Sequence, residues 1–129
     1  MPEKTQYRLF IIMPENTAIS SKDGNPGIPQ IIAQASMLFM ANSHRKENDR
    51  EIEKFITRNV DDKFEFVRMN ESGAIHIHNL VREARNRHVT ADDFIFSSSK
   101  GVHDCAYIFM RTDHNHVLKD IIDRMTTTI

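Results

Sequence analysis

Two histidines and a glutamate have the spacing in this 129-residue chain that best suits metal chemistry. His76 and His78 are separated by one residue, and Glu83 follows five positions after His78. On a β-strand alternate side chains project to the same face, so the two imidazoles would lie side by side and could share a metal ion. The spacing therefore predicts a metal site or a His-dependent active site, provided that residues 74–79 form a strand.

The same spacing resembles the first half of the metal motif of the cupin family, in which a glutamate follows a pair of alternate histidines. The resemblance covers residues 76–83 and implies a metal-binding β-barrel. The glycines that flank the family motif are replaced by Asn70 and Thr90, and the second half of the motif is absent. Four glycines and at least three expected helices also depart from the pattern of a cupin barrel.

A base, an acid and a thiol follow one another at His103, Asp104 and Cys105. On a strand His103 and Cys105 share a face, so a cysteine nucleophile beside a histidine is the chemistry that this order could support. Cys105 also begins the longest apolar run of the chain, residues 105–110, where a thiol packs in the core and stays protonated. We therefore expect Cys105 to be inaccessible and dispensable for function.

Arg82 and Arg85 lie on one face of a predicted helix and are the candidates for contact with phosphate. Glu83 and the following Asp92 and Asp93 weaken their positive field, and no aromatic residue for base stacking is interleaved. Over the whole chain, 17 basic residues against 18 acidic residues give a formal charge of −1. This balance argues against nucleic acid and against an acidic membrane surface as partners.

The elements that position these residues are predicted from the spacing of apolar residues. Residues 6–13 have the pattern of a central strand that is covered on both faces. Residues 15–29 then form one long loop before a helix over 28–41. Met37 and Met40 widen the apolar stripe of this helix, which fits either a deeper core, the more common case, or an exposed surface that awaits a partner.

The middle of the chain leaves one alternative open. Asn48 and Glu51 resemble the capping box of a second helix, which continues to about Val60. Residues 63–78 alternate in the way expected of a β-hairpin, whereas an N-cap at Ser72 would instead begin a helix there. Either pattern leaves a short helix over about residues 80–88.

The C-terminal third predicts a strand pair and a final helix. Strands over residues 94–97 and 102–111 are separated by a turn and should pair with each other. Asp113 can cap a last amphipathic helix, after which residues 126–129 are expected to form a frayed tail.

Length and composition, with 40% hydrophobic and 27% charged residues, fit one domain over residues 1–129. The predicted class is α+β, with a mainly antiparallel sheet of about five strands and three or four helices. A single cysteine and the short apolar runs point to a cytoplasmic protein without a membrane-spanning helix. Seven histidines make the chain histidine-rich, yet its pattern implies no cofactor.

The expected function is that of a small interaction or regulatory protein. Its binding surface would be the methionine-rich helix face at Met37 and Met40, used for a protein partner or for self-association into a homo-oligomer. This expectation rests on the widened helix stripe and on the lack of a complete catalytic constellation. The alternative is a His-dependent enzyme or a metal-binding protein that uses His76 and His78.

Overall fold

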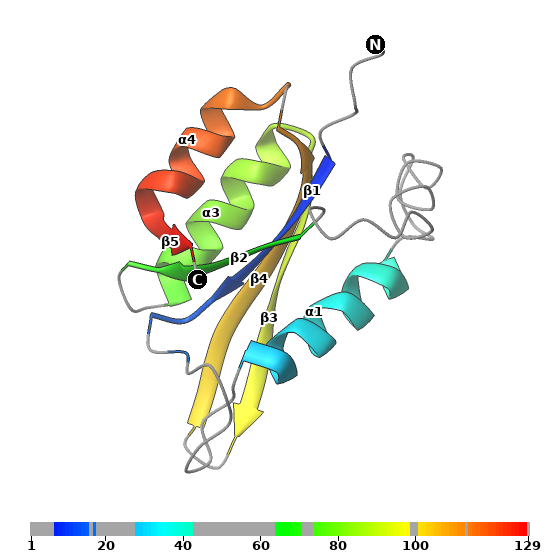
Figure 1. The fold of residues 1–129 in the computed structure, drawn as a ribbon, viewed down its shortest axis with the longest axis vertical. Coiled ribbons are helices and arrows are strands. Elements are labelled where there is room, and N and C mark those ends of the chain that lie inside the picture. The colour runs from blue at the N-terminus through cyan, green and yellow to red at the C-terminus, as the bar shows by residue number, and fades with distance from the viewer. Residues whose placement is uncertain are drawn as a thin grey trace.

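The computed structural model describes residues 7–15, 17, 28–42, 64–70, 74–98, 101–112 and 114–128. In chain order, these residues form β1 (Tyr7–Met13), α1 (Ile28–Asn42), β2 (Phe64–Met69), α3 (Ala74–Asn86), β3 (Thr90–Ser98), β4 (Gly101–Arg111), α4 (His116–Met125) and β5 (Thr126–Thr128). The strands make one sheet in the order β3-β4-β1-β2-β5. Helix α1 covers one face of the sheet, and α3 and α4 cover the other (Figure 1). The described part of the chain is therefore an α+β fold with a helical layer on each side of a sheet.

Strand β1 lies in the middle of the sheet, as its sequence predicts. Leu9, Ile11 and Met13 pack in the cluster that α1 covers, because alternate side chains point to the same face. Phe10 and Ile12 point the other way and pack in the cluster beneath α3 and α4. Both faces of β1 are thus buried, which accounts for its almost unbroken apolar sequence.

The sheet is mixed. Strand β4 pairs antiparallel with β1 and with β3, and β5 pairs antiparallel with β2. Strand β2 runs parallel to β1, with Leu9 opposite Phe64 and Met13 opposite Arg68. A parallel pair needs a crossover connection, and the segment between β1 and β2 contains α1. The predicted antiparallel character therefore holds for three strand pairs but not for the pair of β1 and β2.

The predicted hairpin between residues 64–66 and 75–77 is wrong. Residues 74–86 form the helix α3, and β2 pairs with β1 and β5 instead. On α3, the side chains of Ile77 and Leu80 are buried against the sheet, whereas that of Ile75 is 66% exposed. As a helix, the segment from Ile77 to Ala84 buries one continuous apolar stripe. As a strand, the segment would bury less apolar surface, because only the two alternating isoleucines would face the core.

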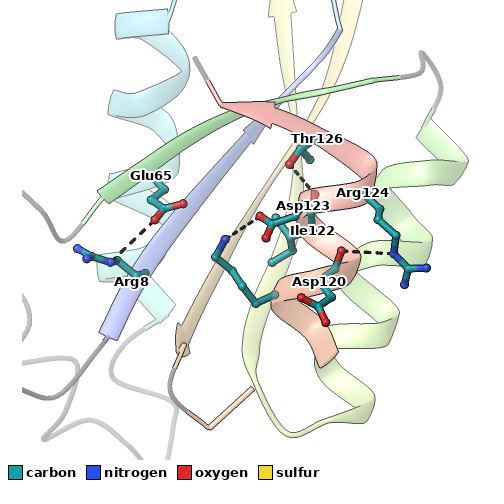
Figure 2. A network of polar contacts seen from close by, with 8 residues as sticks. Arg8, Glu65, Asp120, Ile122, Asp123, Arg124 and Thr126 are labelled. Carbon is teal, nitrogen blue, oxygen red and sulfur yellow. Dashed lines mark hydrogen bonds and ion pairs between the residues drawn. The ribbon is translucent and has the colours of Figure 1, made fainter. Parts of the chain in front are cut away.

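The C-terminal residues Thr126–Thr128, expected to fray, form β5 on the edge of the sheet. The hydroxyl of Thr126 donates to the carbonyl of Ile122 at 2.6 Å, where α4 turns directly into the strand (Figure 2). Asn70 binds this corner as well, because its backbone N–H donates to the carbonyl of Met125 at 2.8 Å. These hydrogen bonds satisfy carbonyls at the helix end that would otherwise lack partners.

Several predicted features lie outside the described residues. They are most of the loop over residues 15–29, the capping-box helix over residues 48–60, and Asp113. Helix α4 begins after Asn115, whose side-chain amide donates to the carbonyl of Arg111 at 2.8 Å and makes no capping hydrogen bond to the helix.

Candidate functional site

The structure does not bring His76 and His78 together. Both residues lie on α3, where side chains two positions apart point about 200° away from each other. Glu83, the third member of the predicted set, forms an ion pair with Arg87 at 2.8 Å. The strand geometry on which the metal hypothesis depended is absent. Within the described residues, no group of three or more His, Cys, Asp or Glu side chains could hold a metal ion.

His78 instead joins helix α3 to the strand β3. Its Nδ1 atom lies 2.5 Å from an Asp93 carboxylate oxygen, and about half of the imidazole is exposed. About two turns further along α3, Arg85 forms an ion pair with the carboxylate of Asp92 at 2.5 Å. The two adjacent aspartates of β3 are therefore each matched by a basic side chain of α3, so this contact docks a helix on an edge strand.

Of the two arginines predicted for phosphate contact, Arg85 is already paired with the carboxylate of Asp92. The neighbouring Arg87 is paired with Glu83. Arg82 is exposed on the same helix. A phosphate would have to compete with acidic side chains for Arg85 and for the neighbouring Arg87, which reduces the attraction that free cations would exert.

Cys105 is fully buried on β4, in the cluster beneath α1. Its Sγ lies 3.9 Å from the backbone carbonyl oxygen of His103, so the thiol contacts the main chain of that residue. Burial, and secondarily the negative charge of Asp104, raises the pKa of the Cys105 thiol from 9.0 to about 12. The residue is thus a protonated core thiol at neutral pH, and it lacks the thiolate that a nucleophile needs.

Helix α1 is held on the sheet by its inner face. Ile31, Ala35 and Phe39 are buried there at helical spacing. The Phe39 ring meets the Tyr107 ring edge-on, with a centroid distance of 5.8 Å, and lies 5.2 Å from the Phe109 ring. These aromatic contacts fix the rotation of the helix about its axis, and so they determine which residues face outward.

The outward residues of α1 form the surface that we call the α1 outer face, defined as Ala33, Met37, Met40 and Ala41. All four are exposed, with exposed fractions of 71% for Met37 and 50% for Met40. Of the two alternatives, the deeper core does not include Met37, because its side chain is exposed. Helix α1 contains no Asp, Glu, Lys, Arg or His over its 15 residues. An exposed helix side without charge is unusual, because polar residues normally cover the outer side of a surface helix.

Side chains from both helical layers form hydrogen bonds with backbone carbonyls of the edge strand β3. Gln34 on α1 donates to the carbonyl of Ile95 at 3.2 Å, and Arg85 on α3 donates to the carbonyl of Ala91 at 3.0 Å. Alternate residues of an edge strand direct their backbone groups away from the sheet, where they could pair with another chain. The two helices occupy such groups near the start of β3, at Ala91, and just past its middle, at Ile95.

One polar group was not singled out by the sequence. Arg68 lies on β2 opposite Met13, and its Nε is buried with no hydrogen-bond partner among the described residues. A buried donor without a partner costs about 1–3 kcal/mol. The only indication in the sequence was a cation within the otherwise apolar end of β2, which is not specific enough to predict this environment.

The chain was compared with protein families, curated proteins and solved structures. No protein-family model, no curated protein and no solved structure matches it. In the described segments, none of the helices combines the length and the apolar character needed to cross a bilayer. The function must therefore be inferred from the surface of the protein itself.

Proposed function

We propose that the protein is an interaction module that binds a protein partner through the α1 outer face. The observation that carries this proposal is the 71% exposure of Met37 on a helix that has no charged residue. Leaving a large apolar side chain in water forgoes about 1.5–3 kcal/mol of burial free energy, which a partner could recover. Neighbouring exposed apolar residues in one patch are typical of binding surfaces.

The types of residue at this face suit protein contact. Methionine is unbranched and polarisable, so Met37 and Met40 can adapt to the shape of a partner. Ala33 and Ala41 are small, and they allow another backbone to come close to the helix. The rigid inner face, anchored by Phe39, means that little order has to be created on binding.

The guarded edge of β3 supports a helix-mediated interaction over strand addition. A partner strand would have to displace the Gln34 and Arg85 hydrogen bonds before it could pair with the carbonyls of Ile95 and Ala91. Strand β5 at the other edge has only three residues, which limits the ladder that it could offer. Contact with the exposed Met37 side chain leaves these two hydrogen bonds in place.

Site-specific photo-crosslinking tests the proposal. A photoreactive phenylalanine analogue is placed at Met37 and, as a control, at Arg82, which is exposed on α3. We expect irradiation of living cells to give a defined protein adduct from position 37 and none from position 82, with both components identified by mass spectrometry. Equal crosslinking at the two positions, or none at position 37, would contradict the proposal.

A second candidate function is proton transfer by His78. The observation in its favour is the 2.5 Å contact between Nδ1 of His78 and Asp93, which leaves Nε2 as the ring atom available to a reactant. In catalytic triads a carboxylate orients the imidazole through the same atom. The supporting result would be turnover of an activated ester or phosphate ester that is lost in His78→Gln and kept in His76→Gln. Absence of turnover by the wild type would mean that the contact of His78 with Asp93 only joins α3 to β3.

A further inference from the structure

We propose that Arg68 binds the carboxylate group of a small organic ligand, at the end of the sheet where β1 and β2 terminate. This site goes beyond the interaction module, because it does not involve the α1 outer face. Arg68 lies opposite Met13 on β1 and Thr127 on β5. Its neighbours Val67 and Met69 are buried in the cluster beneath α3 and α4. Arg68 therefore points to the opposite face of the sheet, the face that α1 covers (Figure 1).

The unmatched charge of Arg68 is the first observation that supports this site. Its Nε is buried without a hydrogen-bond partner, and the residue as a whole is half-buried. Among the described residues, no carboxylate forms an ion pair with Arg68. Other arginines of the same segments do face carboxylates: Arg8 faces Glu65, Arg85 faces Asp92, and Arg87 faces Glu83. Because a cation that is partly removed from water is stabilised by an opposite charge, a ligand can supply the counterion that Arg68 lacks.

The place of Arg68 in the topology is the second, independent observation. Strands β1 and β2 are parallel and end side by side, at Met13 and Met69. The chain passes from β1 to α1 on one face of the sheet and from β2 to α3 on the other face (Figure 1). In open sheets that carry helices on both faces, ligands bind outside the carboxyl ends of the parallel strands, where the connections separate. Arg68 is the second residue from the end of β2, so its charge lies at this position.

The surroundings of Arg68 favour a carboxylate over a phosphate. A guanidinium offers two parallel N–H donors to a planar pair of oxygens, and its single charge matches that of one carboxylate. A phosphate monoester carries about two negative charges at neutral pH and would need further cations or free donors. The strand partners Met13 and Thr127 supply no second cation. The Thr127 hydroxyl donates to Oδ1 of Asn70, and the Asn70 amide donates to the carbonyl of Arg124 at 3.2 Å, so these donors are already used.

Titration with benzoate tests the proposal in the full chain. Binding is followed by NMR in ¹⁵N-labelled protein, through the Nε–H resonance of Arg68 and the backbone amide resonances of Met13 and Thr127. We expect saturable shifts with a dissociation constant on the order of 1 mM, as suits a single bidentate ion pair. Benzamide, which has the same ring without the charge, should cause no saturable shift. Inorganic phosphate should bind more weakly than benzoate.

Two substitutions separate the charge of Arg68 from its planar shape. Arg68→Met keeps an unbranched side chain without the guanidinium, and it should weaken benzoate binding by about tenfold or more. Arg68→Lys keeps the charge but loses the parallel pair of donors, and it should weaken binding by a smaller factor, about threefold. Arg82→Gln removes an exposed arginine of α3 and is the matched control, which should bind benzoate as the wild type does.

Urea denaturation distinguishes a binding role of Arg68 from a structural one. Because its Nε has no partner to lose, Arg68→Met should unfold at a urea midpoint equal to or above that of the wild type. Benzoate at about ten times its dissociation constant should raise the midpoint of the wild type and leave that of Arg68→Met unchanged. An arginine that only supports the fold would show the reverse, a lower midpoint on substitution and no benzoate effect in either protein.

Four results would overturn the proposal. They are a wild type without saturable benzoate shifts, equal shifts with benzamide, unchanged benzoate affinity in Arg68→Met, and phosphate that binds more tightly than benzoate. A strongly destabilised Arg68→Met would also contradict it, and Arg68→Lys then shows whether the folded protein still distinguishes the two cations. None of these results bears on the interaction module, because the crosslinker at position 37 tests a different surface.

Discussion

The two helical layers are attached to the same sheet by different forces. Helix α1 is attached mainly by apolar contacts, with Phe39 against the rings of Tyr107 and Phe109. Helix α3 adds ionic contacts to its apolar stripe, through His78 with Asp93 and Arg85 with Asp92. On the same side of the sheet, α4 is tied along its own length by Lys119 with Asp123 and by Arg124 with the carbonyl of Asp120 (Figure 2).

Under the proposed function, the two helical layers divide stability and binding between them. Charged outer residues keep α3 and α4 in water and do not favour contact with other molecules. Helix α1 docks mainly through its buried apolar inner face, and its outer face carries no charge. We propose that this outer face serves a partner.

The largest effect that separates the layers should come from the inner face of α1. Phe39→Ala removes the ring that contacts Tyr107 and Phe109, and it should lower the free energy of unfolding by about 3–5 kcal/mol in urea denaturation. Met37→Ala, on the opposite side of the same helix, is the matched control and should change stability by less than about 0.5 kcal/mol. Equal losses in the two variants would show that the outer face also packs against the protein's own core.

The buried thiol of Cys105 beneath α1 should make the free energy of unfolding fall at alkaline pH. Burial, and then Asp104, raises the pKa of Cys105 to about 12, so between about pH 9 and 12 the native state retains a proton that the unfolded state has released. The thiol contribution is therefore complete below about pH 9 and is lost as the pH rises. We expect this thiol to lower the free energy of unfolding by about 1.4 kcal/mol between pH 8 and 10.

Cys105→Ala isolates this contribution, because lysine and tyrosine titrate in the same range in both proteins. The difference in urea midpoints between wild type and variant should narrow from pH 8 to pH 10. A difference that stays constant would mean that the thiol ionises equally well in the folded protein, and a rapid reaction of native Cys105 with a thiol reagent at neutral pH would agree with that result.

The sequence predicts the buried side of each helix better than it predicts which strands pair. The central position of β1 and the pairing of β3 with β4 follow from their patterns, as does the inner face of α1. Residues 74–79 were ambiguous because His76, Ile77 and His78 fit alternation as well as one helical turn. The longer stripe through Leu80 and Ala84 decided for the helix, since it buries more apolar surface.

Contacts between distant segments could not be predicted. Beside the pairing of β5 with β2, Asn70 makes hydrogen bonds with Arg124 and Thr127, which are 54 and 57 positions away in the sequence. Three threonines alone predict a strand as poorly as they predict a tail. The candidate site was different: the methionines were identified from their spacing, but the sequence could not show that Met37 would stay exposed, because exposure depends on what else packs there.

On the ionic side, Arg85→Ala should have a smaller effect that depends on salt. The substitution removes the ion pair with Asp92 and the hydrogen bond to the Ala91 carbonyl, both partly exposed, and should cost about 0.5–1 kcal/mol at low ionic strength. Part of this loss should disappear in 1 M salt, because salt screens exposed pairs. Arg82→Ala, an exposed arginine of the same helix, is the control and should be nearly neutral. A loss for Arg85→Ala that is independent of salt would show that packing and not charge docks this end of α3.

The smallest effect should be a gain in stability at the end of α3. His88 has a φ of 62°, and it follows a helix end at which its N–H donates to the carbonyl of Arg85 and the N–H of Val89 donates to the carbonyl of Ala84. This is the Schellman arrangement, in which glycine is the favoured residue because it has no Cβ to strain the left-handed backbone.

His88→Gly should therefore raise the free energy of unfolding by about 0.5 kcal/mol. Part of the relieved strain is offset by the greater freedom of glycine in the unfolded chain. Asn86→Gly, two residues earlier at the last helical position, should instead lower stability by about 0.3 kcal/mol in the same urea titration, because glycine is a poorer helix former than asparagine. If both glycines destabilise the protein, the backbone at His88 is not strained, and the end of α3 is held by the contacts of Val89 with the core.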